Sequence, residues 1–136
     1  MTTTPTFDGV IRQHQQDPHL AWAMLPSGCP QNHAANLLPL PDGTLLCVWF
    51  GGSQEGKADI SVWGARLAPG ATTWSEAVKL SDDPQRSEQN PVLFQAPDGV
   101  LWLLCVIASR AMAENTGEQS PPCSMNPAPL SGNPSA

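Results

Sequence analysis

Two stretches of the sequence decide the fold: HAANLLPLPDGTLLCVWF, which starts at His33, and QNPVLFQAPDGVLWLLCV, which starts at Gln89. They align without a gap at an offset of 56 residues, from 33 to 89. In each stretch an apolar run leads to Pro-Asp-Gly, and a second apolar run follows. Proline fixes φ and glycine accepts a positive φ, so Pro-Asp-Gly predicts a tight turn. Each stretch therefore predicts two antiparallel strands joined by a hairpin turn.

The residues between the two stretches add two further segments typical of strands. These are 59–67 and 74–80, which follow a glycine-rich loop at 51–57 and a turn at 68–72. One period then contains about four strands, which is the content of one blade of a β-propeller. The alternative is that Pro-Asp-Gly before an apolar run is simply a common hairpin. We expect an all-β fold and a partial propeller of about one and a half blades.

The two ends of the chain differ from the repeats. Residues 1–28 are polar with short apolar touches and predict a weakly structured segment. Residues 29–107 hold the repeats. The tail at 108–136 is dominated by Ser, Pro, Asn and Gly, and it predicts disorder because it buries too little apolar area to offset its ordering entropy. The abrupt change after about Cys105 leads us to expect a truncated or frame-shifted gene product.

Charge and hydropathy limit the partners. The formal net charge is −6, and the six Lys and Arg residues are scattered from Arg12 to Arg110, so no basic patch for nucleic acid is expected. The start, MTTTPTFDG, lacks the pattern of a secretory signal, and no stretch approaches the roughly 20 apolar residues of a membrane span. We expect a cytoplasmic protein without a membrane partner.

The four cysteines form no C-x-x-C pair. Cys47 and Cys105 sit inside apolar strand patterns, so we expect reduced thiols in the core. Cys29 and His33 have a metal-like spacing, but the second ligand pair that zinc sites need is missing. We therefore expect neither a metal nor a cofactor.

Four stretches taken together resemble the N-terminal region of the sialidase (neuraminidase) superfamily, which includes bacterial BNR-repeat sialidase-like proteins. Between residues 33 and 104 they read HAANLLPLPDGTLLCVWFGG, DISVWGARL, WSEAVKL and QNPVLFQAPDGVLWLL. Their order and spacing carry the likeness, and the family's Asp box survives only as GATTW at 70–74. The resemblance implies a propeller of the six-bladed type. It also implies exo-glycosidase hydrolysis of a glycoside substrate in the full-length relative.

The resemblance also implies site residues. His33 stands where the family has the Arg of Arg-Ile-Pro, and Glu55 stands at the position of the family's loop acid, with Asp59 as a nearby competitor. It implies Glu55, then Asp59, as the catalytic proton donor, and His33 in the substrate pocket. The alternative for the two acids is a solvated loop carboxylate and a turn cap. Arg66 is a candidate for binding an anionic substrate, the alternative being a surface ion pair.

Two further features bear on activity. Sialidases use a Tyr nucleophile, and this sequence contains no Tyr. We therefore expect the chain to be inactive by itself, and a non-catalytic carbohydrate-binding or interaction module is the alternative function. For the tryptophans we expect packing between sheets rather than stacking on sugars. They are Trp49, Trp63, Trp74 and Trp102.

Overall fold

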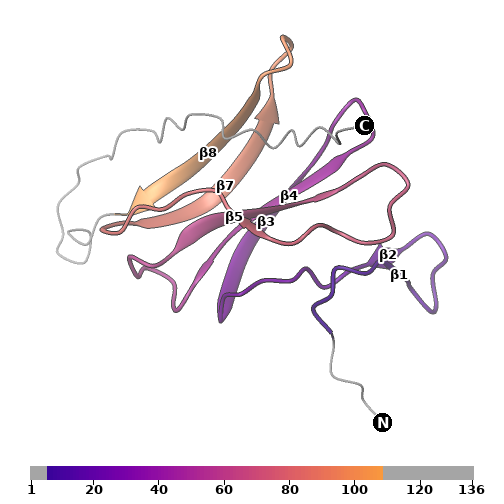
Figure 1. The fold of residues 1–136 in the computed structure, drawn as a ribbon, viewed down its shortest axis with the longest axis horizontal. Helices are drawn as coiled ribbons and strands as arrows, with labels where there is room; N and C mark the ends of the chain where they lie inside the picture. Colours follow the sequence, from indigo (N-terminus) through magenta and orange to yellow (C-terminus); the bar gives the residue numbers. More distant parts are fainter. Residues whose placement is uncertain (1–5, 109–136) are drawn as a thin grey trace, which may run out of the picture.

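The computed structural model describes residues 6–108, which form three antiparallel sheets and no helix (Figure 1). The central sheet has the order β3-β4-β5-β6, with β3 at Gln31–Pro39, β4 at Leu45–Gly52, β5 at Ser61–Leu67 and β6 at Val78–Lys79. The other two sheets pair β7 (Ser87–Gln95) with β8 (Leu101–Ala108), and β1 (Arg12–Gln13) with β2 (Ala21–Trp22). The expected all-β class is confirmed. None of the described residues belongs to a helix able to span a membrane.

The two long hairpins, β3–β4 and β7–β8, are structural copies of each other. Each carries a β-bulge in its first strand, where the register shifts between residues 33 and 36 and again between residues 89 and 92. Inside each bulge one non-glycine residue has a positive φ, 51° at Ala34 and 50° at Asn90. A common turn motif alone does not reproduce a bulge far from the turn. The offset of 56 residues therefore marks a true structural repeat.

The two turns repeat in the same detail. Asp42 Oδ1 accepts the backbone N–H of residue 44 at 2.9 Å, and Asp98 Oδ1 accepts that of residue 100 at 3.1 Å. Gly43 and Gly99 take φ values of 87° and 88°, which glycine adopts without steric cost. Both Pro-Asp-Gly segments are therefore hairpin turns, as the sequence predicts.

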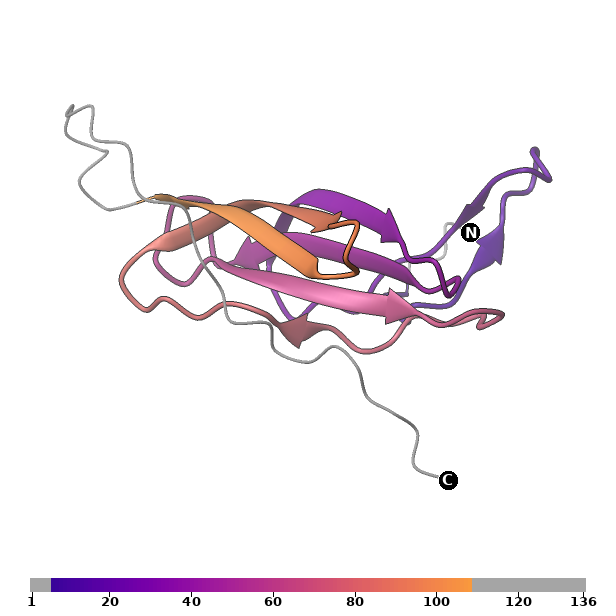
Figure 2. The same cartoon turned by 90° about the horizontal axis from the view of Figure 1, so that it is seen from above.

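The central strand β4 is buried on both faces because its alternate residues enter two separate apolar clusters. The β7–β8 hairpin lies across one face of the central sheet and covers the first cluster (Figures 1 and 2). That cluster contains Leu46, Val48, Val62 and Leu93. The second cluster contains Cys47, Trp49 and Ala65, and it is covered by Leu25, Trp63, Trp74 and Ala77.

The tryptophans and cysteines follow from these two clusters. Trp49 is buried, and Trp63 and Trp74 pack against it, as expected; Trp102 is 53% exposed, so the expectation of packing is wrong for that residue. Cys47 is a buried free thiol, and burial raises its pKa to about 11. Cys105 is half-buried against the first cluster. Cys123 lies outside the described residues.

The strand expected at 74–80 is shorter than predicted. The Ser75 side chain explains this, because its Oγ accepts the Arg66 N–H at 3.0 Å while its own N–H donates to the Arg66 carbonyl at 2.9 Å. A side-chain oxygen thus takes the place of a backbone acceptor, and regular pairing begins only at Val78.

The N-terminal segment is attached to the central sheet, and the expected disorder after 108 lies outside the described residues. Val10 forms an isolated bridge with Thr73. Arg12 Nη2 lies 2.7 Å from the Asp8 carboxylate, and this bond holds the Asp8 pKa low, at about 2. The Arg12 guanidinium also lies 5.5 Å from the centroid of the Trp22 ring. Local contacts therefore order residues 6–28.

Asn36 joins the two layers, and its removal tests that link. Its Oδ1 accepts the N–H of buried Leu93 at 2.9 Å. We expect Asn36→Ala to lower the free energy of unfolding by about 1–3 kcal/mol, because a buried donor loses its partner. Urea unfolding measures this, and hydrogen exchange should speed up more at the Leu93 amide than at Val48. Equal exchange at both amides would contradict a specific link.

Gly52 ends β4 where there is no room for a side chain. A Cβ at Gly52 would lie 2.7 Å from the backbone oxygen of Asp59, whereas one at Gly28 would meet nothing within 4 Å. Because a main-chain atom cannot rotate away, we expect Gly52→Ala to cost about 1–3 kcal/mol. Gly28→Ala is the matched control and should leave thermal unfolding almost unchanged. Similar melting temperatures for the two variants would disprove the constraint.

Candidate functional site

One end of the central sheet collects exposed polar residues from the start of β3 and from the loop between β4 and β5. Gln31 pairs with Gly52 at the end of β4. Its Oε1 accepts the backbone N–H of Glu55 at 3.1 Å, which fixes the loop against β3. Glu55 is exposed, and within residues 6–108 its carboxylate makes no ion pair. We call this region, from residues 31 to 33 and 53 to 59, the polar end.

Asp59 lies in the same loop but has a different environment. Its Oδ2 accepts the Ser53 N–H and its Oδ1 accepts the Ser53 hydroxyl, each at 3.0 Å. These two bonds lower the pKa of Asp59. Asp59 is therefore a carboxylate that closes the loop, and it is poorly suited to give up a proton near neutral pH.

His33 is exposed, and its ring is held in one orientation. It stacks on Phe50, directly opposite in the β3–β4 register, with ring centroids 5.3 Å apart and an interplanar angle of 26°. Phe50 is buried, so it gives the imidazole a fixed apolar support. The bulge begins immediately after His33. Bulges often re-aim side chains beside functional sites.

Sequence reasoning did not single out Gln31 and Asn32. Asn32 Oδ1 accepts the Trp49 indole N–H at 3.0 Å, so this residue links the polar end to the second cluster. Gln31 positions the loop that carries Glu55. The run Gln31-Asn32-His33 was the available signal, but polar residues at the start of a strand have no spacing that distinguishes them from ordinary surface residues.

Arg66 does not join the polar end. It pairs with Leu46 in the β4–β5 register, whereas Phe50, under His33, pairs with Val62. Four residues of strand separate these positions, which corresponds to about 13 Å. The structure therefore brings His33, Glu55 and Asp59 to one end of the sheet and leaves Arg66 toward the other. No ion pair to Arg66 occurs among residues 6–108.

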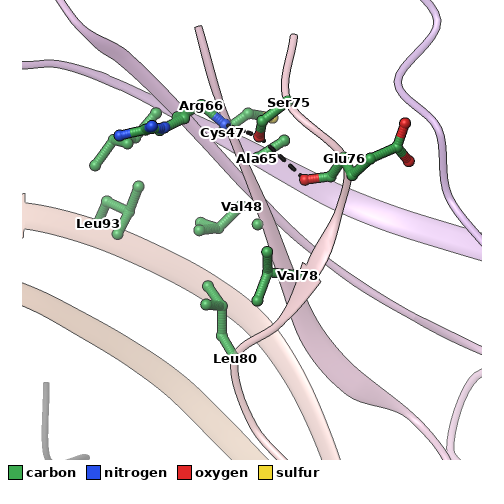
Figure 3. A pocket seen from close by; sticks show the side chains of 11 residues that line it. Cys47, Val48, Ala65, Arg66, Ser75, Glu76, Val78, Leu80 and Leu93 are labelled. Carbon is green, nitrogen blue, oxygen red and sulfur yellow. Dashed lines mark hydrogen bonds between the residues drawn. The ribbon is translucent and has the colours of Figure 1, made fainter. Parts of the chain in front are cut away.

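Arg66 instead borders a groove of about 350 Å³ on the face that β7 partly covers (Figure 3). The walls near β6 and β7 are apolar, with Val48, Val78, Leu80 and Leu93. Arg66, Ser75 and Glu76 lie together at the other end of the groove (Figure 3). Apolar walls with few hydrogen-bonding groups do not match the hydroxyl-rich surface of a sugar. The polar end is the better candidate for carbohydrate.

The described residues contain no group of three His, Cys, Asp or Glu side chains that could hold a metal ion. The chemistry open to the polar end is therefore that of its own groups: a carboxylic acid, an imidazole and amides. These groups can donate and accept hydrogen bonds, and Glu55 can transfer a proton.

Comparison with known families matched residues 43–120 to the BNR repeat-like domain. No curated protein and no solved structure matched the chain. The matched segment begins at the first hairpin turn and runs through β4 to β8, the region that contains the repeated hairpin. It spans more than half of the sequence, and the chain therefore belongs to the BNR repeat-like domain family.

Proposed function

We propose that this chain forms part of a sialidase-like β-propeller and that its polar end binds the glycoside substrate. In this proposal β3–β6 make one blade and β7–β8 make the first half of the next. Support comes from the order of the four-stranded antiparallel sheet and from the repeated hairpin stacked on its face. The BNR repeat-like match supports the same family of folds.

The observation that carries the proposal is the difference between the two loop acids. The Glu55 carboxylate is exposed and makes no ion pair within residues 6–108, while its backbone is fixed by Gln31. Asp59 spends both carboxylate oxygens on Ser53. Glu55 is thus the acid that can meet a ligand. In the complete site it would donate its proton to the leaving glycosidic oxygen as the bond from that oxygen to the sugar breaks.

His33 would contact the sugar beside Glu55. Its stacking on Phe50 fixes the ring, so less conformational entropy is lost when a sugar hydroxyl bonds to it. A histidine cannot grip a carboxylate with the two parallel bonds that an arginine offers. This favours a substrate recognised through hydroxyl groups over one recognised mainly through an acidic group.

A non-catalytic carbohydrate-binding role is the second candidate. It is favoured by the composition, because the sequence contains no Tyr and so does not supply the nucleophile that sialidases use. Both candidates place the glycan at the polar end. They differ in whether Glu55 ever transfers a proton, so binding and turnover must be measured separately.

An NMR titration of the full chain with neutral and sialylated oligosaccharides tests the binding site. We expect shifts at the amides of residues 31–33 and 53–59. His33→Ala should weaken binding about fivefold, because one contact of about 1 kcal/mol is lost. Glu55→Gln should bind nearly as well as the wild type, since an amide resembles the protonated acid. Glu76→Gln, an exposed acid beside the groove, is the matched control.

The same samples separate the two candidates. Neither the wild type nor Glu55→Gln should hydrolyse aryl glycosides above the buffer rate. Turnover by the wild type that Glu55→Gln abolishes would establish a complete enzyme and overturn the expectation of inactivity. Shifts centred on Arg66 would move the site to the groove, and no shift with any glycan at millimolar concentration would remove carbohydrate from the proposal.

A further inference from the structure

The repeat allows each face of one hairpin to be compared with its counterpart in the other. On the covered face of β4, the first hairpin places Leu46, Val48 and Phe50, which are 4%, 2% and 2% exposed. Their counterparts, 56 positions later, are Trp102, Leu104 and Val106, which are 53%, 48% and 55% exposed. The same position in the repeat is thus sealed in one copy and open in the other.

The open face is continuous and apolar. Phe94 lies opposite Trp102 and Val92 lies opposite Leu104 in the β7–β8 register, so these side chains share one side of the hairpin with Val106. We call this set the outer face; it consists of Val92, Phe94, Trp102, Leu104 and Val106. The residues between them point toward the central sheet. In Figure 2 the β7–β8 hairpin forms an outer layer of the molecule.

The outer face also lacks the polar anchor of its counterpart. In the first hairpin Asn36 bonds to Leu93 of the covering layer. The equivalent position in the second hairpin is Val92. No charged residue belongs to the outer face, although the whole chain has a net charge of −6. A surface of this kind is suited to dry packing against another apolar sheet.

We propose that a second copy of this chain covers the outer face, with the two copies related by a two-fold axis that passes near Leu104. The covering hairpin cannot come from the arrangement already present, because the inner side of β7–β8 is engaged with the first cluster. The second cluster is also closed by Leu25, Trp63 and Trp74. Among the described residues, the outer face of another copy is the matching apolar sheet surface.

Area and shape fit this pairing. Five large side chains, each about half-exposed, offer on the order of 500 Å² per copy, so a pair buries roughly 1,000 Å², the lower limit for a specific interface. The bulky pair Phe94 and Trp102 lies near the turn, and the smaller Val106 lies toward the other end. A two-fold axis between them sets the large end of each copy against the small end of the other. We expect a dissociation constant in the micromolar range, about 1–100 μM.

Sedimentation equilibrium of the full chain between about 1 and 300 μM tests the proposal. The wild type should dissociate reversibly from dimer to monomer over this range. Leu104→Lys should weaken the dimer about a hundredfold or more, because it places two like charges beside the axis. The maximum of Trp fluorescence should shift to shorter wavelength on dimerisation, and this shift should be absent in Trp102→Lys.

Leu37→Lys is the matched control because Leu37, on β3, is 56% exposed and lies outside the outer face. It should dimerise like the wild type. Both leucine variants should melt as the wild-type monomer does, which shows that loss of the dimer is not loss of the fold. A wild type that stays monomeric at 300 μM, or a dimer that survives Leu104→Lys, would overturn the proposal. If Leu37→Lys also dissociates the protein, packing is head-to-tail and the two-fold arrangement is wrong.

Discussion

The structure depends on the burial of β4 on both faces. The run Leu45 to Gly52 presents apolar side chains to each side of the sheet, so neither face can be left to water. A single sheet cannot meet this requirement, and two covering layers must be present. The β7–β8 hairpin supplies one of them, and the N-terminal segment with two tryptophans supplies the other. The order of the elements along the chain follows from this need.

The same requirement explains what the sequence could predict. The run TLLCVWF lacks the alternation of a half-exposed strand, which is typical of a strand buried on both faces. The offset of 56 residues and the two Pro-Asp-Gly turns predicted the hairpins and their equivalence. The bulges were not predictable, because Ala34 and Asn90 adopt a positive φ that no glycine announces. The shortened strand before Val78 depends on one serine hydroxyl, which no periodicity reveals.

Burial itself was the least predictable property. Leu46 and Trp102 occupy equivalent positions in two similar hairpins, but one is buried and the other is half-exposed. Their local sequences are alike, so the difference comes from what lies next to each hairpin. A pattern of apolar residues indicates which face of a strand needs cover, but it does not say whether the cover is present. This is why packing was wrongly expected for Trp102 and correctly expected for Trp49.

The candidate site shows the same division. The resemblance to sialidases directed attention to His33, Glu55 and Asp59, and the register brings the strand and the loop that carry them to one end of the sheet. It could not rank the two acids, because that ranking depends on the two bonds from Ser53 to Asp59. Arg66 was considered as an isolated cation, but its register position sets it four residues away along β5. Sequence reasoning therefore found the region, and hydrogen bonding distinguishes the residues within it.

The polar end and the outer face use different parts of the same repeat. The polar end is formed where β3 starts and β4 stops, whereas the outer face is the broad side of β7–β8. Covering the outer face would leave His33 and Glu55 open to solvent. In a two-fold dimer the two polar ends would point in opposite directions, and each could hold one glycan. Such a dimer would bind weak monovalent sugars better when they are displayed together on one surface, because the second contact forms at a high effective concentration.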